Sequence, residues 1–197
     1  PTHHGVFAVA LLMSVPDITV FSPASYAEMK HSFDVGNTLP SSYVVRYPKG
    51  SEDELLNSVF HSLSDFELDD SADADVLIVT YGRITKEALK AKKLLAADGV
   101  RVAVMKFLKL TPLDFDKIAA AISATRARLV VVLEEGIKNG GFGEHLFANL
   151  QICQDKEIIA LDGVFVPHGT LSQLYDFAGL SAEKVRDRIL KWKRRTK

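Results

Sequence analysis

The chain has 197 residues, of which 47% are hydrophobic and 25% charged, and its 24 basic residues nearly balance 25 acidic ones. This composition excludes an intrinsically disordered chain, and the length suits one large domain or one and a half ordinary ones. The formal net charge of −1 gives no reason to expect binding to nucleic acid or to an acidic membrane surface.

Two further features concern the setting of the chain. No apolar run approaches the ~20 residues that cross a bilayer, and no secretory signal pattern opens the sequence. Cys153 is the only cysteine, which rules out an internal disulfide and favours a reducing, cytoplasmic setting. We expect Cys153 to be a small buried hydrophobe. The opening residues Pro1-Thr2-His3-His4-Gly5 lack an initiator methionine and suggest a cut through a longer protein.

The first fifty residues predict a helical stretch followed by a strand–helix–strand unit. Ser22 is expected to cap the helix of this unit, with Pro23 at its first position. Gly36 is expected to end that helix in the left-handed conformation. Such a unit is too small to be stable by itself. The helical stretch and the two strands are expected at Val6 to Val15, Ile18 to Phe21 and Tyr43 to Tyr47.

Residues 51–75 break this pattern, because they contain nine acidic residues and no lysine or arginine. We therefore place a domain boundary here, with an acidic linker between the two parts of the chain. The apolar residues between Leu55 and Leu63 predict a short amphipathic helix inside the linker, packed on one of the domains.

From Val76 onward, strand-like and helix-like periods alternate. The helix that precedes Gly99 has Ile84 and Leu95 on one face, and Asp114 is expected to cap the next helix. Short crossovers of this kind force right-handed connections between parallel strands. The fold class is therefore α/β, a doubly wound and mainly parallel sheet. Its strands are expected at Val76 to Tyr81, Val100 to Val104, Leu129 to Leu133 and Ile158 to Leu161, and two helices end the chain.

Three local patterns need an interpretation of their own. The cluster Gly140-Gly141-Phe142-Gly143 precedes a helix and lacks the lysine of a P-loop, so we interpret it as a packing element. Glu134 and Glu135 at a strand end are interpreted as structural or interfacial. The basic segment 184–197 is interpreted as a helix docked on the domain, with its cations near the negative end of the helix dipole.

Four short motifs of the first fifty residues together resemble one family. They are Pro1-Thr2-His3-His4-Gly5-Val6-Phe7, Val15-Pro16-Asp17, Ser22-Pro23 and Arg46-Tyr47-Pro48-Lys49-Gly50. In this order and spacing they resemble the pyrimidine-binding domain of 1-deoxy-D-xylulose-5-phosphate synthases, which are transketolase-type enzymes. The later segments resemble the C-terminal domain of transketolases and of 2-oxo-acid dehydrogenase β subunits. They are Thr80-Tyr81-Gly82, Leu110 to Asp114 and Val132 to Gly143, and Phe165-Val166-Pro167-His168-Gly169 resembles a tail motif of the synthases.

The resemblance implies three parts: a partial pyrimidine-binding domain at 1–50, the acidic linker at 51–75 and a transketolase C-terminal domain at 76–197. It implies condensation of pyruvate with D-glyceraldehyde 3-phosphate on thiamine diphosphate and magnesium, by a homodimer. His3 matches the family's active-site histidine. Lys49 stands where the family has a phosphate-binding arginine, and Arg46 is a weaker candidate for the phosphate or a structural residue at a strand end.

Parts of the family's machinery are missing from this sequence. The Gly-Asp-Gly…Asn magnesium motif does not occur, and the activating glutamate would precede Pro1. We therefore expect the chain alone to bind no cofactor and to be inactive. The alternatives are the C-terminal region of a transketolase or of a 2-oxo-acid dehydrogenase β subunit, and a non-enzymatic dimerisation module.

Overall fold

A computed structural model describes residues 5–69 and 73–196 and contains a five-stranded main sheet. The strand order is β3-β5-β4-β7-β8. Neighbouring strands are parallel, except that β3 at one edge is antiparallel to β5. The bounds of these strands are β3 Phe66–Leu68, β4 Val76–Tyr81, β5 Val102–Phe107, β7 Leu129–Ile137 and β8 Asp155–Leu161.

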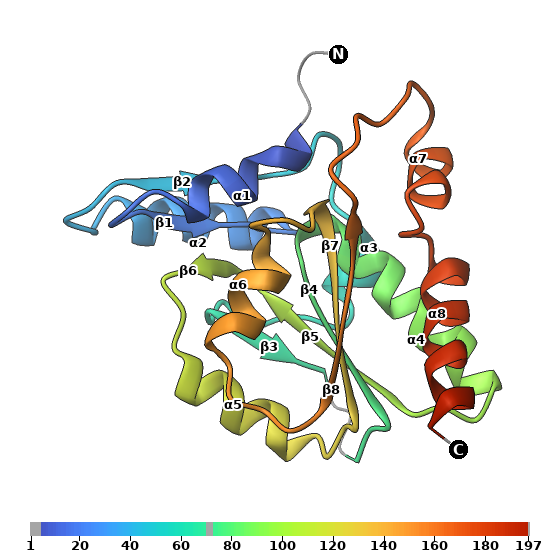
Figure 1. Ribbon diagram of the computed structural model, residues 1–197. Coiled ribbons are helices and arrows are strands. Elements are labelled where there is room, and N and C mark those ends of the chain that lie inside the picture. Colours follow the sequence, from blue (N-terminus) through green and yellow to red (C-terminus); the bar gives the residue numbers. More distant parts are fainter. Residues whose placement is uncertain (1–4, 70–72, 197) are drawn as a thin grey trace.

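Helices cover both faces of this sheet, as Figure 1 shows. One face packs against α4 (Thr85–Ala97) and α8 (Ala182–Arg195), which contact each other. The other face packs against α5 (Phe115–Ala124) and α6 (Phe142–Asn149). All six residues of β4 are buried, because a central parallel strand has apolar layers on both sides. The predicted doubly wound α/β fold is confirmed.

The N-terminal unit forms a second, smaller sheet at the carboxyl end of the main one (Figure 1). Strand β1 (Thr19–Phe21) pairs parallel with β2 (Tyr43–Val45) and antiparallel with β6 (Lys109–Thr111). The third strand of this sheet therefore comes from the second half of the chain. The helical elements of the unit are η1 Gly5–Phe7, α1 Ala8–Met13 and α2 Tyr26–Gly36.

Two predictions about α2 are wrong. The helix starts after Ser25, whose side chain accepts a hydrogen bond from the Glu28 amide, so Ser22 is not its cap. Gly36 lies inside the last turn, and the C-cap Asn37 has right-handed helical angles. A Cβ at Gly36 would lie 2.5 Å from ring atoms of Tyr43. Close packing of a ring, and not a left-handed cap, therefore requires glycine at this position.

The acidic segment 51–75 contains a short helix and a short strand. Helix α3 (Glu54–Asn57) lies where the amphipathic helix was predicted but is shorter, since the prediction reached Leu63. Its Leu56 is buried in the core next to α4. Strand β3 forms the edge of the main sheet, next to β5. This part of the acidic segment therefore belongs structurally to the main domain. The domain boundary between 51 and 75 stays a prediction.

The chain ends in the two helices α7 (Leu171–Phe177) and α8. Earlier in the chain, the short 3-10 helix η2 (Gly82–Ile84) joins β4 to α4. The buried Val185 and Ile189 confirm that the basic last helix is docked on the domain. Within the described residues, no helix is long and apolar enough to span a membrane. Cys153 is exposed, so the prediction of a buried thiol is wrong: the loop after α6 turns its side chain outward.

Candidate functional site

The carboxyl ends of β4 and β7 form the point at which the main sheet reverses its winding. From β4 the chain continues to β5 on one side, and from β7 it continues to β8 on the other. Ligand sites of doubly wound folds lie at such points, because the loops that follow the two strands diverge there. The N-terminal unit covers this region: the Ser22 hydroxyl lies 2.9 Å from the position that a Cβ on Gly82 would take.

Glu134 is fully buried in this region and accepts three hydrogen bonds. The donors are the Tyr81 hydroxyl at 3.1 Å and the amides of Phe142 and Gly143 at 3.1 and 3.0 Å. Burial raises the pKa of Glu134, and these hydrogen bonds oppose the shift. The carboxylate thus takes the place at the start of α6 that an anion would take. The structural interpretation of Glu134 is confirmed.

The glycine cluster before α6 allows this arrangement. A Cβ on Gly141 would lie 2.2 Å from the Ile137 carbonyl and 3.0 Å from the Glu134 carboxylate, and one on Gly143 would lie 3.1 Å from that carboxylate. Side chains at these positions would push the helix away from Glu134. The cluster therefore serves packing, as predicted, and does not hold a phosphate.

We expect Glu134→Ala to lower the free energy of unfolding by about 2–3 kcal/mol, since it leaves buried donors without an acceptor. Urea denaturation of the chain measures this. Glu135→Ala is the matched control, because Glu135 is only half-buried and its expected loss is below about 1 kcal/mol. If both variants lose the same free energy of unfolding, the three hydrogen bonds to Glu134 do not contribute to stability.

Arg46 connects the N-terminal unit to the main domain. Its guanidinium donates to the Glu135 carbonyl at 3.2 Å and lies 5.9 Å from the centre of the Tyr81 ring. Its own amide donates to the Phe21 carbonyl. Arg46 thus reaches the end of β7, which agrees with the structural role considered for it.

Lys49 lies in the loop after β2 and is exposed. Its side chain makes no ion pair with any residue in the described ranges. It lines a hollow of about 310 Å³ together with Tyr26 and Met29 of α2 and with Tyr47. The Arg83 guanidinium donates to the Lys49 carbonyl at 3.1 Å. The ammonium of Lys49 is therefore available to an anionic ligand.

His3 and His4 lie outside the described residues, so the active-site role implied for His3 remains a prediction. The residues that follow them reach the end of β7: the Val6 carbonyl lies 3.5 Å from the position of a Cβ on Gly136. Gly5 and Val6 also line a hollow of about 760 Å³, to which Glu135 contributes.

An ion pair that the sequence analysis missed joins the two parts of the chain. The Lys106 ammonium of β5 contacts the Glu28 carboxylate of α2, and the two side chains are only 4% and 5% exposed. The second Glu28 oxygen accepts from the Ala24 amide at 2.7 Å, and the ammonium lies 5.2 Å from the centre of the Phe60 ring. The only signals in the sequence were a lysine inside an apolar strand and a glutamate inside an amphipathic helix.

The part of the chain that the structure describes holds no group of three or more histidine, cysteine, aspartate or glutamate side chains that could bind a metal ion. The magnesium and diphosphate site that the family resemblance implies is not assigned to any described residue of this chain. No step of a reaction is assigned to such a site on this chain.

Comparison with known proteins identifies the class of this domain. The family profile "Transketolase, C-terminal domain" matches residues 67–185, which is more than half of the chain. The chain therefore belongs to the transketolase C-terminal domain family. Two solved structures share its fold: a split gene transketolase described as an inactive beta4 tetramer, with a TM-score of 0.74 at 24% identity, and a transketolase from Campylobacter jejuni, with a TM-score of 0.67 at 14% identity. The chain aligns over 94% and 92% of its length, and covers 61% and 27% of those chains.

More particularly, the chain is similar to 1-deoxy-D-xylulose-5-phosphate synthases. It is 35% identical over 196 residues to the synthase of Syntrophotalea carbinolica and 31% identical over 196 residues to that of Rhodopirellula baltica. Each alignment covers 94% of this chain, but only 30% and 29% of those relatives. The chain thus spans less than a third of the length of the curated relatives it matches, and it corresponds to their C-terminal part.

Proposed function

We propose that this chain is the C-terminal part of a thiamine-diphosphate-dependent synthase that joins pyruvate and D-glyceraldehyde 3-phosphate, with loss of carbon dioxide, to form 1-deoxy-D-xylulose 5-phosphate. The observation that carries the proposal is the 35% identity over 94% of the chain. This similarity extends beyond residues 67–185, which the transketolase profile matches, into the first fifty residues. Those residues contain the motifs that resemble the synthases.

The chain by itself is proposed to be inactive. Thiamine diphosphate supplies a carbanion equivalent once it is bound, but the sequence lacks the magnesium motif and the described residues hold no metal cluster. The cofactor therefore belongs to the remainder of the enzyme, encoded in one longer chain or in a separate subunit. The inactive beta4 tetramer of the split gene transketolase is a precedent for a partial chain that assembles without activity.

Two residues of this chain are assigned roles in that enzyme. Lys49 binds the phosphate of the acceptor aldehyde, as a point charge in place of the bidentate fork of arginine. His3 hydrogen-bonds the reacting oxygen and transfers a proton during addition to the aldehyde, which an imidazole can do near neutral pH. Arg46 holds the Lys49 loop against the main domain through its contacts with Glu135 and Tyr81.

The assembly and location are proposals as well. We propose a homodimer in the cytoplasm, where the single exposed thiol of Cys153 stays reduced. Light scattering of the concentrated chain is expected to give twice the monomer mass of 21.7 kDa. A mass near 21.7 kDa would contradict self-association.

The function is tested on the complete enzyme, meaning this chain together with the segment that carries the magnesium motif and the activating glutamate. The coding sequence upstream of Pro1 identifies that segment. We expect 1-deoxy-D-xylulose 5-phosphate to form from pyruvate and D-glyceraldehyde 3-phosphate, and no turnover of ketose donors. Turnover of ketose phosphates without pyruvate would identify a transketolase instead, and dependence on a lipoyl partner would identify a dehydrogenase subunit.

In the complete enzyme, Lys49→Ala is expected to raise the KM for D-glyceraldehyde 3-phosphate by about 10–100-fold with a smaller change in kcat. The reason is that a hydrogen bond to a charged group contributes about 1.5–3 kcal/mol. Lys49→Arg should retain the affinity. Lys30→Ala is the control, because Lys30 is exposed on the neighbouring helix α2 and forms an exposed ion pair with Asp34. An unchanged KM in Lys49→Ala would remove the residue from the acceptor site.

A further inference from the structure

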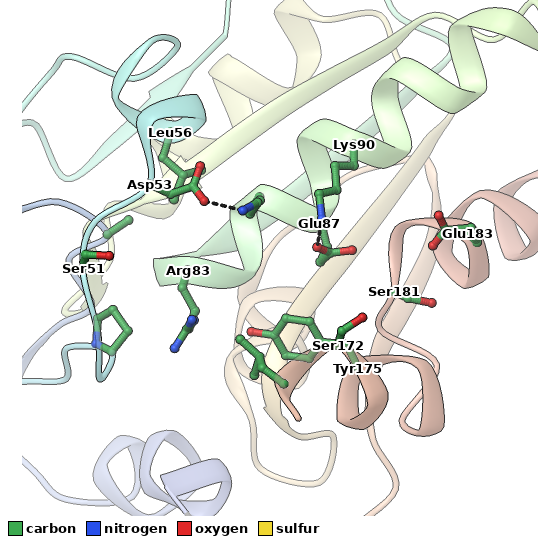
Figure 2. A pocket seen from close by; sticks show the side chains of 14 residues that line it. Ser51, Asp53, Leu56, Arg83, Glu87, Lys90, Ser172, Tyr175, Ser181 and Glu183 are labelled. Atoms are coloured by element: carbon green, nitrogen blue, oxygen red, sulfur yellow. Dashed lines mark hydrogen bonds and ion pairs between the residues drawn. The ribbon is translucent and has the colours of Figure 1, made fainter. Parts of the chain in front are cut away.

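A polar cavity of about 410 Å³ lies where the N-terminal unit meets α4, α7 and α8. Its side chains come from parts of the chain that are far apart in sequence: the turn before α2, the segment after β2, helix α3, η2 with the start of α4, and α7 with the start of α8 (Figure 2). None of the motifs that led to the proposed function contributes its charged side chain to this cavity. Its size is within the range of small-molecule sites, which is about 300–1,000 Å³.

Arg83 is the cation of this cavity that lacks a carboxylate partner. It follows β4 directly and is half-buried. One of its N–H groups donates to the Lys49 carbonyl at 3.1 Å, and it takes part in none of the ion pairs of the described residues. A guanidinium has five N–H donors in a planar fork, so donors remain for an oxyanion.

Tyr175 of α7 faces Arg83 in the cavity. Figure 2 shows its hydroxyl directed toward Arg83 from the opposite side. Tyr175 is 8% exposed, and its buried hydroxyl makes no direct hydrogen bond within the described residues, although the Glu135 carboxylate lies close to it. Burial raises the pKa of Tyr175, and the neighbouring Glu135 carboxylate adds to this while Arg83 opposes it. The hydroxyl therefore keeps its proton and can donate a hydrogen bond to an acceptor in the cavity.

The carboxylates that line the cavity are already compensated or solvated. Asp53 pairs with Lys86 at 2.5 Å. Glu87 pairs with Lys90 at 2.8 Å, and its second oxygen accepts from the amide that starts α8 at 2.9 Å. Glu183, which also lines the cavity, is exposed to water. Among the described charged side chains that line the cavity and are not exposed, Arg83 is therefore the one without a partner of opposite charge, which favours an anionic ligand over a cationic one. The Glu135 carboxylate is near the Tyr175 hydroxyl but is not part of this lining.

We propose that this cavity binds the phosphate group of a small phosphomonoester, with Arg83 and Tyr175 as the two ligand-binding residues. A phosphate has three terminal oxygens, which match the fork of an arginine, a phenol and the hydroxyls of Ser51 and Ser172 that line the same cavity. Because Pro48 and Ser51 flank Lys49 in sequence and form one wall, a bound ligand also orders the Lys49 loop.

Isothermal titration calorimetry of the 197-residue chain with sn-glycerol 3-phosphate tests the proposal. We expect saturable binding that Arg83→Met weakens at least about tenfold, and Tyr175→Phe by about threefold or more, in line with lost charged and neutral hydrogen bonds. Arg194→Met, at an exposed arginine near the end of α8, is the control and should change nothing. Thermal unfolding of each variant shows that it is folded, and Arg83→Lys, which keeps the charge but loses the fork, replaces Arg83→Met if that variant is not.

Three results would overturn the proposal. One is the absence of saturable binding up to about 10 mM, a concentration that corresponds to less than about 3 kcal/mol of binding free energy. Another is equal binding of glycerol or D-glycerate, which lack the phosphate. The third is that Lys49→Ala loses binding while Arg83→Met keeps it, which would place the phosphate at Lys49. That third result would support the proposed function while it rejects this inference, so the two are tested separately.

Discussion

Replacing Glu28 by alanine is expected to lower the free energy of unfolding of this chain by about 3–5 kcal/mol, the cost of leaving one member of a buried ion pair without its partner. The Lys106 ammonium would then be buried between β5 and α2, where it contacts Glu28 and the Phe60 ring. The same substitution removes the acceptor of the Ala24 amide. Urea denaturation followed by circular dichroism measures the loss.

The stability of the conservative variant Glu28→Gln is expected to depend on pH. Burial lowers the pKa of Lys106 to about 8 from its ordinary value of 10.5, and removal of the Glu28 charge leaves that effect unopposed. Between these two values the unfolded chain binds more protons than the folded one, so stability rises with pH. We therefore expect the Glu28→Gln variant to become more stable as the pH rises from 8 to 10.5.

The matched control is Asp34→Ala on the same helix. Asp34 pairs with Lys30, but the two side chains are 60% and 79% exposed, and an exposed pair contributes about 0.5 kcal/mol or less. A loss in Glu28→Ala no larger than that of Asp34→Ala would mean that the ion pair does not hold the N-terminal unit on the sheet. Stability of Glu28→Gln that falls between pH 8 and 10.5 would contradict the role of Lys106.

In the complete enzyme, His3→Asn is expected to lower kcat for 1-deoxy-D-xylulose 5-phosphate formation by about 10²–10⁴-fold, the usual contribution of a positioned proton-transfer group. Asparagine keeps a hydrogen-bonding side chain of similar reach but cannot carry the proton. The KM for D-glyceraldehyde 3-phosphate should change little, since Lys49 and not His3 is assigned to the phosphate. This split in kcat and KM separates the two roles.

His61→Asn is the control for the histidine, because His61 is exposed in the segment between α3 and β3 and belongs to no family motif. Its activity should stay within about twofold of the parent enzyme. Steady-state kinetics at saturating pyruvate measures both variants. A loss of less than about tenfold in His3→Asn would remove His3 from the proton-transfer role, which needs at least about 10².

The sequence by itself determined the local elements and their class. Short apolar runs such as Val76–Tyr81 predict the buried parallel strands, because a strand that is covered on both faces needs apolar side chains in both directions. Caps are local in the same way: Asp114 accepts from the Lys117 amide at the start of α5, as predicted. The failed cap at Ser22 shows the limit, because Ser25 offers the same chemistry three residues later.

Only the tertiary structure decided which distant residues meet. Glu28 and Lys106 are 78 positions apart, and strand β6 joins a sheet whose other strands lie in the first fifty residues. Arg83 and Tyr175 likewise face one cavity from different helices. Periodicity gives the direction of a side chain relative to its own helix or strand, but a contact between elements depends on how they pack, which no local pattern contains.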